Sequence, residues 1–90
     1  MRRIDVSKRA AKYLRSLLPK HARQVGDKIL DLAKHPEPPD SKPLQGHDYR
    51  RADMGEHRII YRFSEDCLFI ALVGKRNDGD VYRKLDRMMG

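Results

Sequence analysis

Apolar residues in the first third of the chain recur at helical spacing in two stripes. The first contains Val6, Ala10, Tyr13, Leu14, Leu17 and Leu18, and the second contains Ala22, Val25, Ile29, Leu32 and Ala33. Pro19 interrupts the first helix, and Pro36 ends the second because the residue before a proline is disfavoured in helical geometry. We therefore predict an antiparallel pair of helices, preceded by an edge strand at residues 2–6 and capped by Ser7.

The second half of the chain has the patterns of strands. Residues 50–54 and 57–63 predict a hairpin around Gly55-Glu56, and residues 67–73 are apolar throughout, as in a central strand covered on both faces. Residues 37–43 form a short proline-rich connection, and residues 77–80 form a turn that leads into a last helix. That helix has its apolar stripe at Val81, Tyr82, Leu85 and Met88 or Met89.

The predicted order is β-α-α-β-β-β-α. It indicates an α+β fold in which an N-terminal helical hairpin packs on a small, mostly antiparallel sheet, with a short C-terminal helix. Ninety residues suffice for one modest core, so we expect a single domain over residues 1–90.

Strand alternation separates the hairpin side chains into two faces. His57, Ile59, Tyr61 and Phe63 should face the core, and Arg58, Ile60 and Arg62 should face away from it. A two-residue turn sets Met54 opposite His57, Asp53 opposite Arg58, and Arg51 opposite Ile60. The non-core face would then carry Arg51, Asp53, Arg58 and Arg62.

This cationic face has two interpretations. It is either a solvated sheet surface with an Asp53–Arg58 ion pair, or, with Arg76 converging on Arg58, a site for a phosphodiester. The chain has 20 Lys and Arg residues against 13 Asp and Glu residues, which gives a net charge of +7. This charge favours a polyanionic partner and so is consistent with the phosphodiester site.

Other features narrow the function classes. The single cysteine, Cys67, excludes an internal disulfide and is expected to pack as a small hydrophobe in a reducing, cytoplasmic compartment. No apolar run is long enough for a membrane span, and the N-terminal residues lack the pattern of a signal peptide. The four histidines are scattered, so we expect no metal and no other cofactor.

Three short motifs carry a family resemblance. Lys42-Pro-Leu-Gln-Gly46, Gly55-Glu-His-Arg-Ile-Ile-Tyr61 and Val73-Gly-Lys-Arg-Asn-Asp-Gly-Asp-Val-Tyr82 resemble, in this order and spacing, motifs of the RelE/ParE superfamily of toxins from bacterial type II toxin–antitoxin systems. The resemblance is strongest to the RelE branch. It implies a RelE-like fold and ribosome-dependent cleavage of mRNA, in which the ribose 2′-oxygen attacks the adjacent phosphorus.

The resemblance also implies roles for individual residues. Arg76 matches an arginine that assists the leaving group, Arg58 one that stabilises the phosphate, and Tyr82 an aromatic residue that stacks on or orients the substrate. Arg51 takes the place of a basic residue on the preceding strand, while Lys75, Arg62 and Arg50 are expected RNA contacts. Asp53 stands where RelE enzymes have a second basic residue, so it is either a general base or only a partner of Arg58. An alternative alignment places Arg50 and Ala52 in the two basic positions.

The expected partners follow from the same resemblance. They are a cognate antitoxin protein, the ribosome and mRNA, with no membrane. The alternatives are a ParE-like, non-catalytic toxin that inhibits DNA gyrase, and an inactive nucleic-acid-binding module. Members of the ParE branch generally lack the combination of basic residues and tyrosine, so the sequence favours the nuclease.

Overall fold

The computed structural model describes residues 1–77 and 80–89, with only the backbone at positions 80, 81, 84, 88 and 89. Eight elements follow one another along the chain: β1 (Arg3–Val6), α1 (Lys8–Ser16), α2 (Pro19–Lys34), β2 (Ser41–Pro43), β3 (Arg50–Met54), β4 (His57–Phe63), β5 (Cys67–Lys75) and α3 (Asp80–Met89). The predicted α+β order is confirmed, with one strand added. The turn predicted at residues 77–80 lies partly outside the described residues, as do the side chains of Met88 and Met89.

The five strands form one sheet in the order β1-β5-β4-β3-β2. The β1–β5 pair is parallel and the other three pairs are antiparallel, so the sheet is mostly antiparallel, as predicted. The interpretation of residues 37–43 as connection only was wrong, because Ser41–Pro43 pairs with Arg50–Ala52 as an edge strand. A three-residue strand containing a proline has too little alternation to be recognised from sequence. The apolar strand is also longer than predicted, ending at Lys75.

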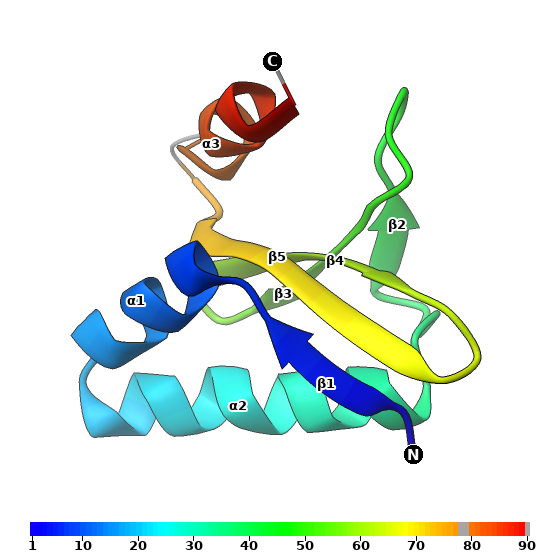
Figure 1. The fold of residues 1–90 in the computed structure, drawn as a ribbon. Helices are drawn as coiled ribbons and strands as arrows, with labels where there is room; N and C mark the ends of the chain where they lie inside the picture. The colour runs from blue at the N-terminus through cyan, green and yellow to red at the C-terminus, as the bar shows by residue number, and fades with distance from the viewer. Residues whose placement is uncertain (78–79, 90) are drawn as a thin grey trace.

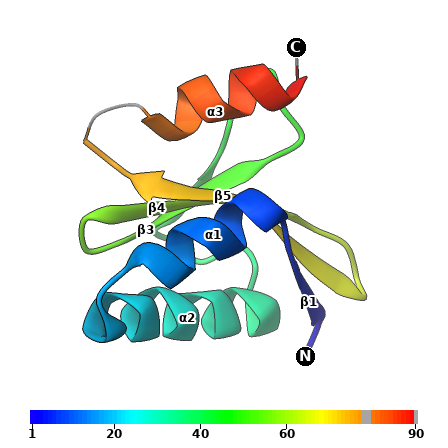
Figure 2. The same cartoon turned by 60° about the vertical axis from the view of Figure 1, so that its left-hand side comes forward.

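Helices cover both faces of the sheet. Figure 2 shows α1 and α2 on one side and α3 on the other. The chain turns from α1 into α2 through Leu17 and Leu18, and Pro19 begins α2, where its missing N–H costs nothing. Two residues of the predicted stripe are exposed, because Val6 belongs to β1 and Leu18 lies in the turn between the helices.

Two apolar clusters fill the spaces on either side of the sheet. The larger lies under α1 and α2 and is made of Ala10, Val25, Ile29, Leu32, Ala33, Ala52, Ile59, Tyr61, Leu68, Ile70 and Val73. The smaller lies under α3 and is made of Tyr49, Ile60, Ala71, Leu72 and Leu85, with Tyr82 packed against it. Of the two interpretations of the cationic face, the solvated surface holds only in part: the Asp53–Arg58 ion pair forms, but α3 covers a portion of the face. Ile60 is fully buried on that face, because α3 covers it.

A bulge in β5 supplies part of the smaller cluster. Ile60 pairs with Leu72 but Tyr61 pairs with Ile70, which leaves Ala71 as an extra residue. The carbonyl of Ala71 accepts a hydrogen bond from the Ser7 hydroxyl at 2.6 Å. The same Ser7 oxygen accepts from the Ala10 N–H at 3.1 Å and caps α1, as predicted. Ser7 thus joins the start of α1 to the bulge.

Replacing Ser7 by alanine should lower the free energy of unfolding by about 1 to 2 kcal/mol, because both the helix cap and the bond to the bulge are lost. The control is Ser16→Ala, whose exposed hydroxyl bonds only to the Tyr13 carbonyl of its own helix. That variant should stay within about 0.5 kcal/mol of the wild type in urea unfolding. Equal losses in the two variants would contradict the assigned role of Ser7.

Candidate active site

Side chains from β3, β4, α3 and the residue that follows β5 meet at one end of the sheet. Figure 1 shows how these elements lie. Arg58 is at the centre. Its Nε and Nη2 donate to the two carboxylate oxygens of Asp53 at 2.7 and 3.2 Å, and its Nη1 donates to the Tyr82 hydroxyl at 2.6 Å. Arg76 Nη1 lies 3.9 Å from Asp53 Oδ2. The four residues Asp53, Arg58, Arg76 and Tyr82 are called the arginine cluster below.

The hairpin register places this cluster. The turn of Gly55, whose φ is +59°, and Glu56 sets Asp53 opposite Arg58, as predicted. On the other side of β4, Arg58 pairs with Gly74, which has no side chain to stand between Arg58 and α3. The Arg76 N–H donates to the Glu56 carbonyl at 3.0 Å, so the strand end is tied to the hairpin turn.

The cluster is a charged group between the protein interior and solvent. The Arg58 side chain is 14% exposed, Asp53 28% and Arg76 46%. Hydrogen bonds from Arg58 lower the pKa of the Asp53 carboxyl, with further contributions from the charges of Arg58, Arg51 and Arg76. Asp53 is therefore ionised and a weak base at neutral pH, which favours its role as a partner of Arg58.

Further cations extend the cluster along the sheet. Arg51 pairs with Ile60 on β4 and with Lys42 on β2, so the side chains of Arg51 and Lys42 stand on the face that carries Asp53 and Arg58. Sequence reasoning missed Lys42 as a member of this face, because the strand that carries it was not predicted. The direct bond between Arg58 and Tyr82 was also missed, since residues 24 positions apart give no local signal.

Three predicted RNA contacts lie apart from the arginine cluster. Lys75 pairs with His57 at the end of β5 and lines a pocket with the α1–α2 turn, on the opposite face of the sheet. Arg50 Nη2 donates to the Ser41 hydroxyl at 2.9 Å, and its Nη1 lies 3.7 Å from Glu37. Arg62 shares the face of Arg58 but stands four residues along β4, about 13 Å away.

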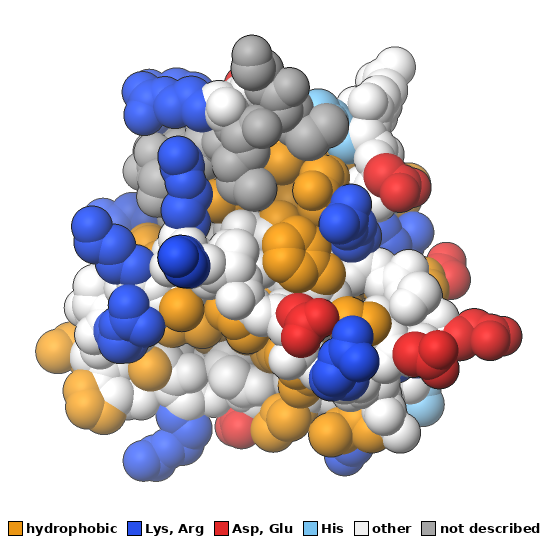
Figure 3. Space-filling view, in the orientation of Figure 1, with side chains coloured by type: hydrophobic (Ala, Val, Ile, Leu, Met, Phe, Trp, Pro, Cys, Tyr) orange, Lys and Arg blue, Asp and Glu red, His pale blue; other side chains and the backbone are white. Residues whose placement is uncertain are grey.

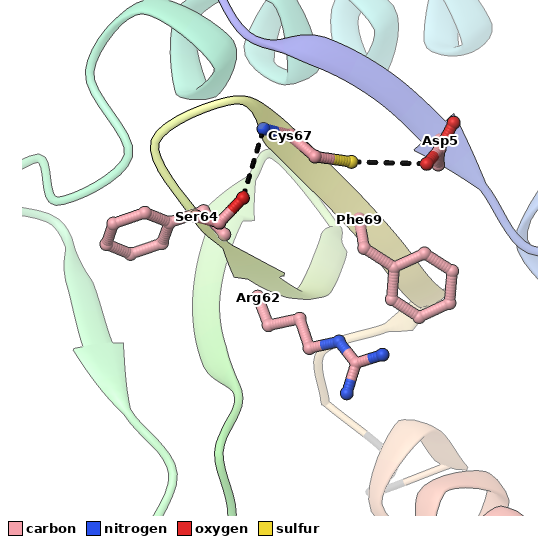
Figure 4. Close-up of a pocket in the computed structure, with 6 residues that line it drawn as sticks. Asp5, Arg62, Ser64, Cys67 and Phe69 are labelled. Carbon is pink, nitrogen blue, oxygen red and sulfur yellow. Dashed lines mark hydrogen bonds between the residues drawn. The ribbon is translucent and has the colours of Figure 1, made fainter.

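Arg62 instead lies over two aromatic rings. Its guanidinium carbon is 5.1 Å from the centre of the Phe69 ring and 5.6 Å from that of Tyr49. Figure 4 shows Arg62 beside Phe69 in a surface pocket that Asp5, Ser64 and Cys67 also line. The Cys67 thiol donates to Asp5 Oδ2 at 3.1 Å and is only partly buried, so it does not pack as a simple hydrophobe.

His57 faces the larger apolar cluster, as predicted. It is 5% exposed, and its Nδ1 lies 3.0 Å from the Tyr13 hydroxyl. Burial lowers the pKa of His57, and the nearby charge of His21 adds to the effect. A neutral histidine on the opposite face has no geometric access to Arg58.

Charge is unevenly spread over the face drawn in Figure 3. Lys and Arg side chains gather on the side where α1 lies, and acidic side chains gather on the other side, near the turn between β4 and β5. Within residues 1–77 and 80–89, no group of three or more His, Cys, Asp or Glu side chains is placed to hold a metal ion. No helix in the same part of the chain is long and apolar enough to cross a membrane.

The sequence matches the family model of the ParE toxin of type II toxin–antitoxin systems, parDE, over residues 4–79. The chain belongs to this ParE toxin family. It is thus the toxin component of a type II toxin–antitoxin system, and the resemblance to the RelE/ParE superfamily is confirmed. Among curated proteins, no match is found.

Solved structures place this ParE-family chain in the RelE fold. A free mutant form of the Escherichia coli toxin RelE has a TM-score of 0.81 at 20% identity, covering 99% of this chain and 98% of that one. A chain of the archaeal RelE–RelB complex of Pyrococcus horikoshii has a TM-score of 0.73 at 27% identity, and the match covers 86% of this chain and 97% of that one. A chain of the RelBE2 toxin–antitoxin complex of Mycobacterium tuberculosis has a TM-score of 0.73 at 24% identity, and the match covers 83% of this chain and 98% of that one.

The electrostatics of the site predict how Asp53 titrates. Because Arg58 holds the carboxylate in its charged form, the midpoint of Asp53 in a carbon-13 NMR titration should fall below the ordinary value of about 3.9. In Arg58→Gln the midpoint should rise. The stability that this pair contributes is present above the ordinary carboxyl pKa and is lost as the pH falls through the lowered one. An unchanged midpoint in the variant would contradict the pairing.

Proposed function

We propose that this ParE-family toxin is an endoribonuclease that cuts mRNA on the ribosome and thereby inhibits translation. The observation that carries the proposal is the convergence of Arg58, Arg76 and Tyr82 on one face of the sheet, around a single point. These are the three residues to which the family motifs assign the chemistry. Arg58 comes from a different strand than the segment that carries Arg76 and Tyr82, and a surface that serves only solubility gives no reason for these residues to meet.

The chemistry requires stabilisation of negative charge. When the ribose 2′-oxygen attacks the adjacent phosphorus, charge builds up on the phosphate oxygens, and the bond to the 5′-oxygen breaks. Arg58 supplies a planar fork of donors for the phosphate oxygens. Arg76, more exposed at the strand end, donates to the departing 5′-oxygen. The 2′-hydroxyl gives its proton to water and the 5′-oxygen takes one from water, so the products are a 2′,3′-cyclic phosphate and a 5′-hydroxyl end.

Tyr82 orients the substrate. Its ring packs against the smaller apolar cluster while its hydroxyl contacts Arg58, so the side chain is fixed at both ends. The guanidinium carbon of Arg58 lies 5.6 Å from the centre of the ring. A nucleobase that stacks on the open part of this ring is brought beside the arginines. Lys42, Arg51, Arg62, Lys75 and Arg50 contribute longer-range attraction for the RNA and the ribosome.

A cognate antitoxin is the second partner. Among the solved relatives, RelE is found in complex with RelB. A toxin with a net charge of +7 favours an antitoxin segment of opposite charge that covers the basic face. We place the protein in the cytoplasm, where ribosomes, mRNA and the antitoxin occur together.

A second candidate function is inhibition of DNA gyrase by binding. The description of the matching family as ParE toxins favours it. This function needs no convergence of arginines on a tyrosine, so the geometry of the site supports the nuclease better. Growth arrest with intact mRNA and damaged DNA would identify it.

The nuclease is tested by inducing the toxin in a bacterial host and mapping mRNA 5′ ends across the transcriptome. The wild type should give cuts in phase with codons. Arg58→Ala and Arg76→Ala should each reduce these cuts by about 100-fold or more, because each removes a donor to developing charge. Co-expression of the neighbouring small gene, if it encodes the antitoxin, should abolish the cuts and relieve the growth arrest.

The matched control is Arg23→Ala. Arg23 is exposed on α2, on the other side of the sheet, and its loss changes the net charge equally. Cutting by this variant should stay within about 2-fold of the wild type. Equal losses in all three variants would show that overall charge, rather than the arginine cluster, is responsible, and an absence of cuts in the wild type would refute the nuclease.

A further inference from the structure

The carboxylate of Asp53 lies at the point on which the arginines converge. Arg58 donates to both of its oxygens, from Nε at 2.7 Å and from Nη2 at 3.2 Å, and Arg76 Nη1 lies 3.9 Å from Oδ2. Arg51, two residues away on the same face of β3, adds a third positive charge. Three cations surround one carboxylate, so the group as a whole stays positive.

The geometry of this contact is that of a phosphate site. A guanidinium edge with two parallel N–H donors binds two oxygens of a carboxylate or two oxygens of a phosphate in the same way. In the folded protein, Asp53 takes the Nε–Nη2 edge of Arg58, while Nη1 points to Tyr82. The edge of Arg58 best formed to receive a phosphodiester is thus already occupied by an internal anion.

The contact is also open to replacement. Asp53 is 28% exposed and Arg76 46% exposed, so an incoming anion can reach both from solvent. Arg58 is only 14% exposed and needs an anion at this edge, so Asp53 leaves only in exchange for another anion that takes its place. A phosphodiester that engages Arg58 and Arg76 together, and extends along Arg51, offers more contacts than one carboxylate does.

We propose that Asp53 is an internal substitute for the substrate phosphate: it holds the arginines in place in the free toxin and is displaced when RNA binds. The proposal rests on the proposed function, in that the displacing group is the scissile phosphodiester of RNA. It assigns Asp53 to control of access and positioning, and not to proton transfer. The toxin therefore favours substrates that other contacts, such as those of the ribosome, deliver to the cluster.

The alternative role for Asp53 makes the opposite prediction. If the carboxylate stays bonded to Arg58 while the phosphate takes another edge, Asp53 helps to orient Arg58 in the complex. Its removal would then weaken RNA binding. Under the displacement proposal, removal of the carboxylate strengthens binding, since no internal anion has to leave.

The test compares binding of a short fluorescent single-stranded RNA by the purified wild type, Asp53→Asn and Asp27→Asn, followed by anisotropy at several salt concentrations. Asp27 is exposed on α2, so its variant matches the change in net charge. Asp53→Asn should bind about 3- to 10-fold more tightly than Asp27→Asn, since removal of a local anion outweighs a distant one. Equal, weaker or undetectable binding by Asp53→Asn overturns the proposal.

A second measurement uses the wild type alone, in case Asp53→Asn folds poorly. Inorganic phosphate is added to nitrogen-15-labelled toxin while the Nε–H resonance of Arg58 is followed. Displacement of Asp53 should shift this resonance in a saturable way, and an unchanged resonance overturns the proposal. Both readouts are independent of cleavage. If the wild type cuts no mRNA but Asp53→Asn binds RNA more tightly, the nuclease is refuted and the displacement stands. If the wild type cuts mRNA but Asp53→Asn does not bind RNA more tightly, the displacement is refuted and the nuclease stands.

Discussion

The position of Arg58 is the constraint on which the candidate site of this protein depends. A guanidinium that is largely covered must have its donors satisfied, and here a carboxylate from β3 and a hydroxyl from α3 meet this need. These bonds join the three elements β3, β4 and α3. Arg58 thereby ties the last helix to the sheet at the candidate site.

The rest of the fold supports this arrangement from both sides. The larger apolar cluster fixes β3, β4 and β5 against α1 and α2, and so sets the plane of the sheet. The smaller cluster, in which Leu85 of α3 joins Ile60 of β4, holds α3 over the other face. The bulge at Ala71 directs an additional residue into that cluster, and Ser7 binds the carbonyl of the bulge. Ordinary burial of apolar groups thus brings Tyr82 to Arg58.

Local patterns in the sequence were enough for much of this account. Alternation and a two-residue turn predicted the pairing of Asp53 with Arg58, and the proline positions predicted the helix boundaries. Contacts between residues far apart in the sequence could not be predicted in this way. Nothing around Tyr82 specifies a bond to Arg58, and nothing around Ile60 indicates that α3 covers it, because periodicity describes one element at a time. The motifs of the toxin family selected Arg58, Arg76 and Tyr82 as candidates, and the structure brings these three together but separates Lys75 and Arg50 from the arginine cluster.

The nuclease proposed for this ParE-family chain rests on one chemical claim, that the ribose 2′-oxygen of the mRNA is the nucleophile. In the most direct test, the purified toxin is incubated with ribosomes that carry a modified mRNA. This mRNA has a single 2′-deoxynucleotide on the 5′ side of the mapped cut. The account predicts that this mRNA stays intact at that position, while the all-ribose mRNA yields a 2′,3′-cyclic phosphate and a 5′-hydroxyl end. Cleavage of the deoxy-substituted mRNA, or no cleavage of either, would contradict it.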